Sequence, residues 1–574
     1  MHVVATAGHV DHGKSTLVLR LTGTDPDRFA EEKARGLTID LGFAWTTLAS
    51  GRELAFIDVP GHVRFLKNML AGVGAVDACL FVVAATEGWK PQSEEHLRIL
   101  ELLGVSHGLV ALTKVDLVDD EWRELVHLEL VDHLAGTFLA EAEVIDVDAP
   151  SGRGVDDLTA ALDRMLATTP TAADRGRPRL WVDRSFAAKG SGTVVTGTLA
   201  GGRFGVEDEL VLSPGNIRVR VRALQSHQRA WPEVGPGHRV AVNLTGVSHH
   251  DVVRGHALVR PGQWAPTSTF DGSLHVLASV GHDVSRRGAY QLYLGSGEYA
   301  VNMRVLGADV IGAGRHGLVR LHLPSPLPLL PGDRFVLRES GRGETVGGGE
   351  VLDVEPLLAA AKARPDRSVD RVIGERGWIG VDELERLTGE RRSSTLGRWI
   401  TAPGVVEDAA GRLRAAVAEA GRRGLDVAGL DERDRAVLAT VTDVVVVDGR
   451  ARQAGAEATD WDAHPYLAAL RAEPFAPPAP DGIERGELRD LVRAGVVVES
   501  EGAWFAADAI AEAAHRVAVL LAEAPEGVTV SAVRDALGTS RKHVLPLLAH
   551  LDATGVTRRR DDLRIGGPRL PILE

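Results

Sequence analysis

Cysteine is almost absent from this chain, and long apolar runs are missing altogether. The one cysteine, Cys79, lies in the apolar run DACLFVVAA, so no internal disulfide can form and we interpret it as a small core residue. No run of about 18 apolar residues is found, which predicts no membrane-spanning helix. The first residues, MHVVATAGHV, lack the basic segment followed by an apolar one that marks a signal peptide. These absences predict a cytoplasmic protein.

An excess of positive charge is also missing. The chain carries 65 Lys and Arg against 79 Asp and Glu, a formal net charge of -14. Such a surface is repelled by nucleic acid as a whole, so any RNA contact must come from local basic patches. The length of 574 residues is too great for one core and predicts several domains.

The pattern of apolar runs changes twice along the chain. Up to about residue 170, short apolar runs alternate with helix-like stretches, which is typical of buried parallel strands in an α/β sheet. Residues 180–356 are rich in short β-like runs with Gly and Pro between them, which predicts two β-barrels divided near 261–267. From about residue 365, helix, turn, helix and β ribbon recur in about four units, the outline of winged helices.

A phosphate-binding loop opens the α/β region. Residues Gly8–Ser15 fit G-x-x-x-x-G-K-S, after a strand-like run and before a helix-like one. Backbone N–H groups of such a loop surround phosphate oxygens at a helix N-terminus. Lys14 is then able to reach the β- and γ-phosphates, and Ser15 to ligate Mg²⁺.

Two further positions complete the predicted metal site. Asp58 ends a strand-like run in the sequence DVPGH, where its carboxylate can hold Mg²⁺ through water, and the N–H of Gly61 can face the γ-phosphate. Thr38 lies between the two motifs, and its hydroxyl can join the metal shell when the γ-phosphate is present. We therefore predict Ser15, Thr38 and Asp58 as metal ligands.

The sequence Thr113-Lys114-Val115-Asp116 predicts that the bound nucleotide carries guanine. It follows the strand-like run GLVAL, and Asp116 can accept hydrogen bonds from N1 and N2 of guanine. Adenine lacks this donor pair, and a site left with unpaired polar groups rejects the wrong ligand by factors of about 10⁴.

The motifs GHVDHGKST, RGLTID, DVPGH and TKVD, in this order, resemble those of the translational GTPases of the elongation factor Tu class. The resemblance covers residues 1–170 and implies that two barrels follow. It implies that His62 positions the attacking water, together with Thr38 and Gly61, while Asp11 helps to neutralise phosphate charge. Whether His62 acts by orientation or by charge stays open. Hydrolysis is expected to be slow until the ribosome completes the site. The implied ligands are GTP or GDP and Mg²⁺, and the implied nucleotide-binding residues are Asp11, His12, Gly13, Lys14, Ser15, Thr16, Thr113, Lys114, Asp116, Asp148 and Ala149.

This chain departs from the class at two positions. Thr113 stands where the guanine motif usually begins with Asn, and a hydroxyl offers fewer hydrogen-bonding atoms than an amide. We therefore expect weaker nucleotide binding and no need for an exchange factor. Asp148-Ala149 stands where the last guanine loop usually has Ser-Ala.

Three features resemble the bacterial selenocysteine-specific elongation factors. Only 23 residues separate Lys14 from Thr38, the barrel region opens with WVDRSF and KGSGTVVTGT, and a winged-helix extension follows. The resemblance implies a GTPase that delivers selenocysteyl-tRNA to the ribosome at recoded UGA codons. It also implies that the last winged helix binds an mRNA hairpin. We expect a monomer.

The same resemblance implies a pocket for the selenocysteyl group. A selenol is ionised at neutral pH, so a fixed guanidinium would favour it over the neutral seryl group. The candidates are Asp183, Arg184 and Arg239, with Asp183 orienting the arginines. The alternative is an ordinary ion pair on the barrel surface, worth about 0–1 kcal/mol.

A basic cluster near the end of the chain is the predicted RNA contact. From residue 541 to 564 there are six Lys or Arg and three acids, a local charge of +3. The first two lie where a second helix would begin and the others on the wing, so both groups can reach phosphates. The residues are Arg541, Lys542, Arg558, Arg559, Arg560 and Arg564. The earlier winged helices carry no such cluster and are interpreted as spacers.

The predicted fold is therefore multidomain: an α/β P-loop GTPase domain, two β-barrels and a C-terminal array of winged helices. The predicted boundaries are 1–172 for the GTP-binding domain, 178–263 and 265–356 for the barrels, and 364–414, 415–463, 464–509 and 510–574 for the winged helices.

Three alternatives remain at this point. One is another aminoacyl-tRNA carrier of the elongation factor Tu class. A second, from a different class, is a GTP-controlled regulator whose winged helices bind DNA. A third is a nucleotidyltransferase subunit on the same GTPase core, although no sulfate or adenylate site is evident in the sequence.

Overall fold

The structure, a computed structural model, describes residues 1–26, 38, 40–61, 68–70, 76–188, 190, 192–455 and 460–573. The chain forms two compact units, Met1–Val406 and Glu407–Glu574, and each is considered by itself. Within these described ranges, no helix has the length and apolar character needed to cross a membrane.

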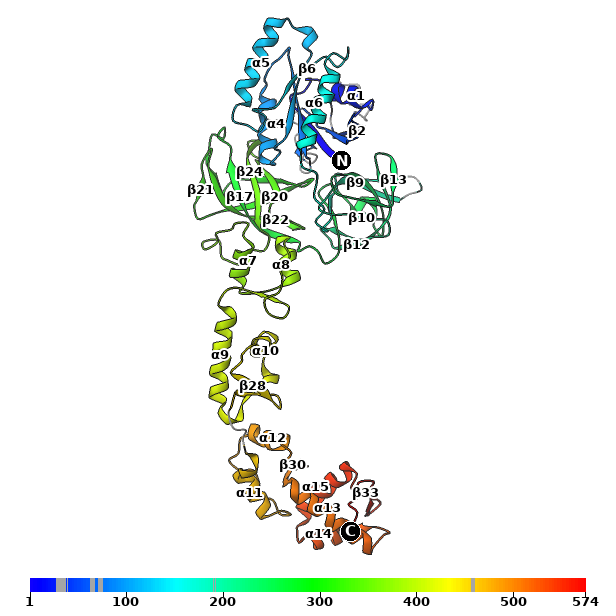
Figure 1. The fold of residues 1–574 in the computed structure, drawn as a ribbon, viewed down its shortest axis with the longest axis vertical. Helices are drawn as coiled ribbons and strands as arrows, with labels where there is room; N and C mark the ends of the chain where they lie inside the picture. Colours follow the sequence, from blue (N-terminus) through cyan, green and yellow to red (C-terminus); the bar gives the residue numbers. More distant parts are fainter. Residues whose placement is uncertain are drawn as a thin grey trace. The chain divides into compact units, whose positions relative to one another are not determined.

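The first unit begins with a six-stranded sheet of order β2-β3-β1-β4-β5-β6, in which only the β2–β3 pair is antiparallel. Its elements are β1 (His2–Ala7), α1 (Lys14–Thr22), β2 (Gly42–Thr47), β3 (Glu53–Asp58), β4 (Ala78–Ala84), α4 (Pro91–Leu102), β5 (Gly108–Thr113), the short turn η2 (Val115–Leu117), α5 (Asp120–Leu134), β6 (Val144–Val147) and α6 (Val155–Thr168). Residues of α4 and α5 share one apolar core with the sheet, and residues of α1 and α6 share another. Helices thus cover both faces (Figure 1), which confirms the predicted α/β fold.

A first barrel follows, closed because β11 pairs with both β16 and β12. Its ring contains β7 (Arg179–Trp181), β9 (Gly192–Ala200), β11 (Glu209–Ser213), β12 (Ile217–Ser226), β15 (Arg239–Thr245) and β16 (Ala257–Val259). Added to it are β8 (Arg184–Ala188), β13 (Arg229–Trp231), the pair β10 (Phe204–Gly205) and β14 (Glu233–Val234), and the turn η3 (His249–Asp251). Alternating apolar residues of these strands fill the interior, as barrel closure requires.

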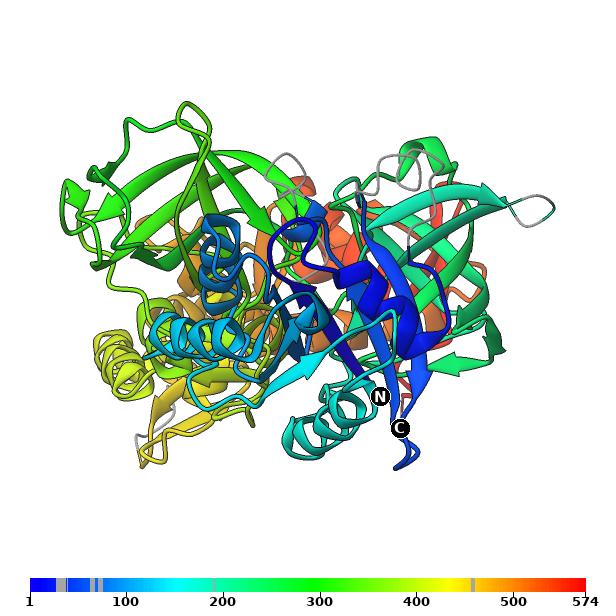
Figure 2. The ribbon, with the colours of Figure 1, turned by 90° about the horizontal axis from the view of Figure 1, so that it is seen from above.

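A second closed barrel has the order β17-β22-β20-β19-β23-β24. Its strands are β17 (Thr267–Val276), β19 (Tyr290–Leu294), β20 (Gly297–Leu306), β22 (His316–Leu327), β23 (Arg334–Glu339) and β24 (Glu344–Asp353), with the small pair β18 (Val284–Ser285) and β21 (Val310–Ile311). The two barrels lie side by side against the GTPase domain in both views (Figures 1 and 2). Their presence confirms the predicted pair of barrels.

Ion pairs join these parts of the first unit. Arg338 of the second barrel lies 2.8 Å from Glu95 on α4, and Arg179 of the first barrel lies 2.5 Å from Asp333 of the second. A small helical module completes the unit and shares the core of the second barrel. It consists of α7 (Val369–Arg376), β25 (Trp378–Gly380), α8 (Val381–Thr388) and β26 (Trp399–Thr401).

The second unit contains three further small modules of helices and short β sheets. The first has α9 (Val405–Ala420), which begins at the unit boundary, η4 (Gly421–Arg423), β27 (Leu425–Asp426), η5 (Val427–Gly429), α10 (Glu432–Leu438), β28 (Val444–Val447) and β29 (Arg450–Gln453). The next has η6 (Trp461–Ala463), α11 (Pro465–Ala472), α12 (Arg485–Arg493), β30 (Val497–Ser500) and β31 (Ala503–Ala506). The last has α13 (Ala507–Glu523), β32 (Val528–Thr529), α14 (Val530–Leu537), α15 (Arg541–Thr554), β33 (Thr557–Arg560) and β34 (Leu563–Gly566). Three helices and a three-stranded ribbon make this last module a complete winged helix, as predicted.

Candidate nucleotide and RNA sites

The loop Gly8–Ser15 connects β1 to α1 at the carboxyl end of the parallel sheet. A Cβ added to Gly8 would lie 2.1 Å from the carbonyl oxygen of Val82, so only glycine fits there. Asp11 and Gly13 have left-handed φ angles of 61° and 85°. The backbone therefore curls over the start of α1, the arrangement that turns N–H groups toward a phosphate.

Lys14 is the first residue of α1, and its side chain lies beneath this loop. Its Nζ donates hydrogen bonds to the carbonyl oxygens of Gly8 at 3.0 Å and His9 at 2.5 Å. Burial lowers the pKa of this ammonium group to about 8, although the charges of Asp58 and Asp11 act in the opposite direction. An anionic group beside Lys14 would favour its charged form further.

Gly61, of the motif DVPGH, packs against the phosphate-binding loop. A Cβ on Gly61 would lie 2.5 Å from Nζ of Lys14 and 2.7 Å from the backbone nitrogen of Val10. A larger residue at this position would therefore displace the lysine. The predicted catalytic residue His62 lies outside the described residues.

The three predicted metal ligands converge on one point. The Ser15 hydroxyl lies 2.8 Å from the Thr38 hydroxyl and donates to Oδ2 of Asp58 at 2.7 Å. The other carboxylate oxygen of Asp58 accepts a hydrogen bond from the Thr6 hydroxyl at 2.7 Å. The sequence analysis did not identify Thr6. Its only sign is that it is the single polar residue in the apolar run VVATA within β1.

Helix α4 holds the loop from below. The N–H of Gly8 donates to Nδ1 of His96 at 3.1 Å, and the N–H of Val10 donates to Oε1 of Gln92 at 3.4 Å. Burial, with a smaller contribution from Lys14, lowers the pKa of His96 to about 3, so the ring is neutral and carries its proton on Nε2. Gln92 and His96 are four residues apart and so lie on one face of α4. This spacing is the only feature of the sequence that could have pointed to them.

The predicted guanine loop is tied to the phosphate loop through Thr113. Its hydroxyl donates to the carbonyl oxygen of His12 at 2.7 Å and lies 3.3 Å from that of Val83. Burial lowers the pKa of the His12 imidazole to about 3. Lys114 has a left-handed φ of 57° and Asp116 is exposed in η2, where a base can reach it.

Asp148 and Ala149 are buried at the end of β6. The Asp148 carboxylate accepts a hydrogen bond from the N–H of Ser151 at 3.0 Å, and the Asp148 N–H donates to the carbonyl oxygen of Arg153. Asp148 thus closes its own turn. Thr16, the third residue of α1, is exposed.

The predicted selenocysteyl pocket is also brought together. Arg239 makes a two-point contact with Asp183, one arm of which measures 2.9 Å, and the Thr196 hydroxyl donates to the same carboxylate at 2.7 Å. The alternative considered was a surface pair between Asp183 and Arg184. The Asp183 side chain is 7% exposed and is held by Arg239, while Arg184 lies 3.1 Å from Asp40. The guanidinium groups of Arg239 and Arg184 lie 3.3 Å and 4.8 Å from the ring centre of Phe43 on β2.

Five of the six predicted RNA-binding side chains are exposed. Arg541 and Lys542 are the first two residues of α15, and Arg558–Arg560 follow one another on β33. Arg564 is different, because only 9% of its side chain is exposed and its Nε lies 2.8 Å from Oδ2 of Asp552 on α15. The prediction for Arg564 is therefore corrected: its guanidinium fixes the wing to the helix instead of facing RNA.

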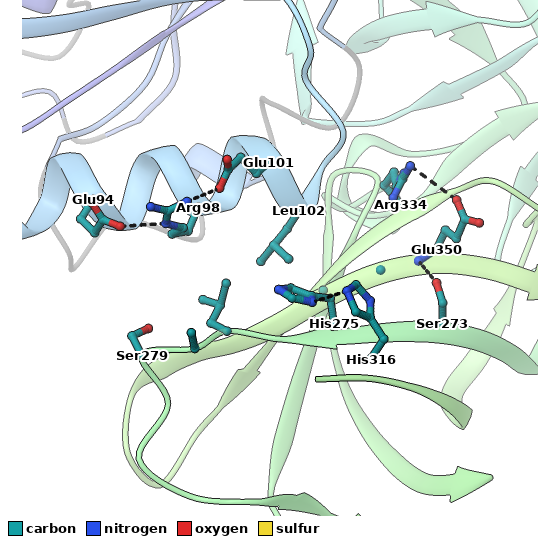
Figure 3. A pocket seen from close by; sticks show the side chains of 14 residues that line it. Glu94, Arg98, Glu101, Leu102, Ser273, His275, Ser279, His316, Arg334 and Glu350 are labelled. Atoms are coloured by element: carbon teal, nitrogen blue, oxygen red, sulfur yellow. Dashed lines mark hydrogen bonds and ion pairs between the residues drawn. The ribbon is translucent and has the colours of Figure 1, made fainter. Parts of the chain in front are cut away.

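A cavity of about 860 Å³ lies between α4 and the second barrel, apart from the phosphate loop (Figure 3). Nδ1 of His275 and Nε2 of His316 lie 2.9 Å apart in it. Arg98 is engaged by both Glu94 and Glu101, at 2.7 Å and 2.6 Å. None of the predicted nucleotide-binding residues lines this cavity.

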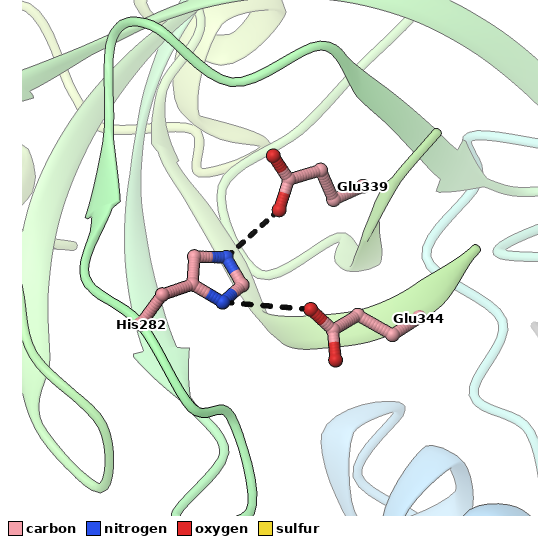
Figure 4. Close-up of side chains that lie close together, drawn as sticks. All are labelled: His282, Glu339 and Glu344. Atoms are coloured by element: carbon pink, nitrogen blue, oxygen red, sulfur yellow. Dashed lines mark ion pairs between the residues drawn. The ribbon is translucent and has the colours of Figure 1, made fainter. Parts of the chain in front are cut away.

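One His–Glu–Glu group lies on the second barrel (Figure 4). Nε2 of His282 is 2.8 Å from Glu339 and Nδ1 is 3.5 Å from Glu344. Glu339 also pairs with Arg342 at 2.8 Å. The two carboxylates face different ring nitrogens, so we interpret the group as contacts of one imidazole ring with the two strands of the β23–β24 hairpin.

Known family models match this chain in three separate regions. The family model for the elongation factor Tu GTP binding domain matches residues 1–168. The β-barrel domain of the selenocysteine-specific elongation factor matches residues 272–357, and the elongation factor SelB winged helix matches residues 520–565.

Individual relatives carry the same description. The chain is 31% identical over 626 residues to the selenocysteine-specific elongation factor of Escherichia coli K12, with 97% of each chain covered. It is 38% identical over 400 residues to that of Desulfomicrobium baculatum, an alignment that spans 67% of this chain and 63% of the relative. The crystal structure of a bacterial selenocysteine-specific elongation factor, EF-Sec, superposes with a TM-score of 0.74 at 26% identity, covering 98% of this chain and 99% of the other.

Proposed function

Because this chain belongs to the family of selenocysteine-specific elongation factors, we propose that it delivers selenocysteyl-tRNA to the ribosome, using GTP, at UGA codons marked by an mRNA hairpin. The observation that carries this proposal is the buried Arg239–Asp183 pair beside Arg184, at the face of a GTPase domain. Another elongation factor Tu-like carrier does not need the last winged helix, and a DNA-binding regulator does not need the arginine pocket. The combination of the two therefore favours the proposed function.

The GTPase activity rests on the first domain. We assign the phosphates to the backbone N–H groups from Asp11 to Ser15 and to the Lys14 ammonium group, and the guanine base to Asp116. The remaining assigned nucleotide-binding residues are Asp11, His12, Gly13, Thr16, Thr113, Lys114, Asp148 and Ala149. Gly61 faces the γ-phosphate in this assignment, and His62, outside the described residues, positions the attacking water.

The oxygen donors of Ser15, Thr38 and Asp58 fit Mg²⁺, which prefers hard oxygen ligands. Bound there, Mg²⁺ supplies positive charge against the phosphates. Thr6 keeps the Asp58 carboxylate in place, and the Lys14 ammonium group is held against the carbonyl oxygens of Gly8 and His9. Phosphoryl transfer needs mainly positioning and charge, which these side chains provide.

Selectivity for selenocysteine is proposed to come from charge. The selenolate is anionic and the seryl hydroxyl is neutral, so a guanidinium favours the former. Asp183 holds Arg239 in one orientation by two hydrogen bonds, and the Phe43 ring supports both guanidinium groups.

RNA binding at the other end of the chain is assigned to Arg541, Lys542 and Arg558–Arg560, which are exposed on one winged helix. The modules before it are proposed as spacers, with the domain boundaries given above. A monomer working in the cytoplasm, where ribosomes are, completes the proposal. Thr113 is expected to permit GDP release without an exchange factor, which a stopped-flow GDP dissociation rate measures.

The test is the affinity of the GTP-bound protein for selenocysteyl-tRNA and for the seryl form of the same tRNA. We expect at least a tenfold preference for the selenocysteyl form, of the size that one charged contact provides. Equal binding of the two forms would contradict the assigned pocket, and binding of neither would contradict the proposed function.

A further inference from the structure

Arg254 joins three segments of the first unit that are distant in sequence. It lies between η3 and β16 of the first barrel. Its Nε donates to the carbonyl oxygen of Asp183 at 3.0 Å, one terminal nitrogen donates to Oδ1 of Asn68 at 2.7 Å, and the other donates to Oδ1 of Asp40 at 2.9 Å. The three nitrogens of one planar guanidinium group thus donate hydrogen bonds to three separate segments of the chain.

Two of these segments adjoin the nucleotide site. Asp40 is two residues after Thr38, whose hydroxyl lies 2.8 Å from that of Ser15. Asn68 is seven residues after Gly61. Arg254 therefore contacts the chain two residues beyond the assigned metal ligand Thr38 and seven residues beyond Gly61, which faces the γ-phosphate in the proposed function.

The third direction leads to the selenocysteyl pocket, and Asp40 reaches that pocket by a second route. Oδ2 of Asp40 lies 3.1 Å from a terminal nitrogen of Arg184, which also donates to the carbonyl oxygen of Leu41. The Asp40 carboxylate is thus shared between Arg184 and Arg254, one oxygen to each. Its side chain is only 20% exposed, so these charge-assisted contacts are partly shielded from water.

We infer that Arg254 and Asp40 form a relay through which the nucleotide state sets the position of the pocket arginines. Arg254 is a positioning residue in this role, since it acts through Asp40, Asn68 and Asp183. The inference rests on the proposed function, because it concerns the pocket assigned there. It adds Arg254, which lies outside the motifs of the nucleotide site, and gives a role to Asp40, the last residue of the motif RGLTID.

Chain length couples the two positions. Asp40 is two residues after Thr38, and two residues of extended chain span at most about 7 Å, so a displacement of Thr38 well beyond that length must carry Asp40 with it. Asp40 then leaves both arginines, and Arg184 loses its anionic partner beside Phe43. Thr38 held beside Ser15 and Asp58 keeps the arginines in place, which favours the selenolate in the GTP form.

Linkage makes the effect reciprocal. If GTP raises the affinity for selenocysteyl-tRNA by some factor, the tRNA raises the affinity for GTP by the same factor. Coupling factors of about 5- to 150-fold are typical of such two-site systems. A relay of two partly buried ion pairs can supply a factor in this range.

The experiment measures the dissociation constant of selenocysteyl-tRNA for the full chain with GDP and with a non-hydrolysable GTP analogue. For the unchanged protein we expect the analogue form to bind more than tenfold tighter. Arg254→Ala and Asp40→Asn should each reduce this ratio at least fivefold by weakening the analogue form, with binding in the GDP form unchanged. The double variant should lose no more than the stronger single variant, because both belong to one relay.

Arg338→Ala is the matched control. Arg338 makes an ion pair of similar burial between the GTPase domain and the second barrel, 2.8 Å from Glu95 and away from Asp40. It should leave the ratio unchanged. Thermal unfolding of each variant checks the fold, and Asp40→Asn, which keeps the shape of the side chain, carries the test if Arg254→Ala fails to fold.

Three outcomes would overturn the inference. An unchanged ratio in Arg254→Ala and Asp40→Asn removes the relay. If Arg254→Ala weakens tRNA binding equally with GDP and with the GTP analogue, Arg254 contacts the RNA directly or only holds the domains together, and it does not transmit the nucleotide state. Failure of the unchanged protein to bind the tRNA in either form contradicts the proposed function itself, and the inference falls with it.

Discussion

The nucleotide site and the C-terminal basic patch are built in opposite ways. In the first, the groups around the phosphate loop are held by others: Asp58 by Thr6 and Ser15, and the loop itself by His96 of α4. In the second, Arg541, Lys542 and Arg558–Arg560 are exposed on one helix end and one strand. A site that positions atoms for a reaction needs rigid side chains, whereas a site that attracts a phosphate backbone needs exposed charge.

Loss of the buried carboxylate should give the largest effect. Asp58→Asn removes the charge that accepts hydrogen bonds from the Ser15 and Thr6 hydroxyls. The Mg²⁺-dependent part of GTP affinity should then fall by about 100-fold or more, equivalent to about 2.7 kcal/mol. Titration with a fluorescent GTP analogue, with and without Mg²⁺, measures it. A variant that retains full Mg²⁺-dependent affinity would contradict the assigned ligand set.

Charge reversal on the wing should affect RNA and nothing else. The triple variant Arg558→Glu, Arg559→Glu and Arg560→Glu should lower affinity for the mRNA hairpin by at least tenfold and reduce the slope of affinity against salt, since phosphate contacts are lost. Nucleotide affinity should be unchanged.

Arg564→Ala is the contrasting variant of the same wing. It leaves Asp552 without its partner and should lower the stability of the module by about 1–3 kcal/mol, seen by thermal unfolding. An RNA defect in Arg564→Ala at full stability would restore the original prediction for this residue.

A smaller effect is expected in the selenocysteyl pocket. Arg239→Lys keeps a positive charge but cannot make the two-point contact with Asp183. Preference for selenocysteyl- over seryl-tRNA should fall by about 5- to 20-fold, in line with loss of one or two kcal/mol. Competition binding with the two tRNA forms measures it, and an unaltered preference would argue that charge alone, not geometry, selects the ligand.

Acid should weaken the GTPase domain through His96. Its pKa in the folded protein is about 3, below the ordinary value of 6.5, so the unfolded state binds a proton first as pH falls. Stability from this residue is complete above about pH 6.5 and is lost as pH falls toward 3, by about 2 kcal/mol at pH 5. His96→Gln should unfold at lower temperature at pH 7 but lose less between pH 7 and 5. Equal pH slopes would contradict the neutral buried ring.

The sequence predicted what lies in contiguous motifs and missed what arrives from elsewhere in the chain. Ser15 and Asp58 meet because the ends of the parallel strands β1 and β3 lie at one edge of the sheet, and Thr38 joins them from a position before β2. Thr6, His96 and Arg254 carry no motif, and only folding brings them to the site. Arg564 was mistaken for an exposed cation because charge in a basic run says nothing about which side chain turns inward.

The most direct test of the account is single-turnover GTP hydrolysis by the full chain with selenocysteyl-tRNA bound. It should be measured alone, and with ribosomes programmed with UGA followed by the hairpin of a selenoprotein message from the same organism. The account predicts slow hydrolysis alone and an acceleration of at least about 10³-fold on those ribosomes, the scale by which completing a GTPase site acts. Equal rates with and without ribosomes would contradict it.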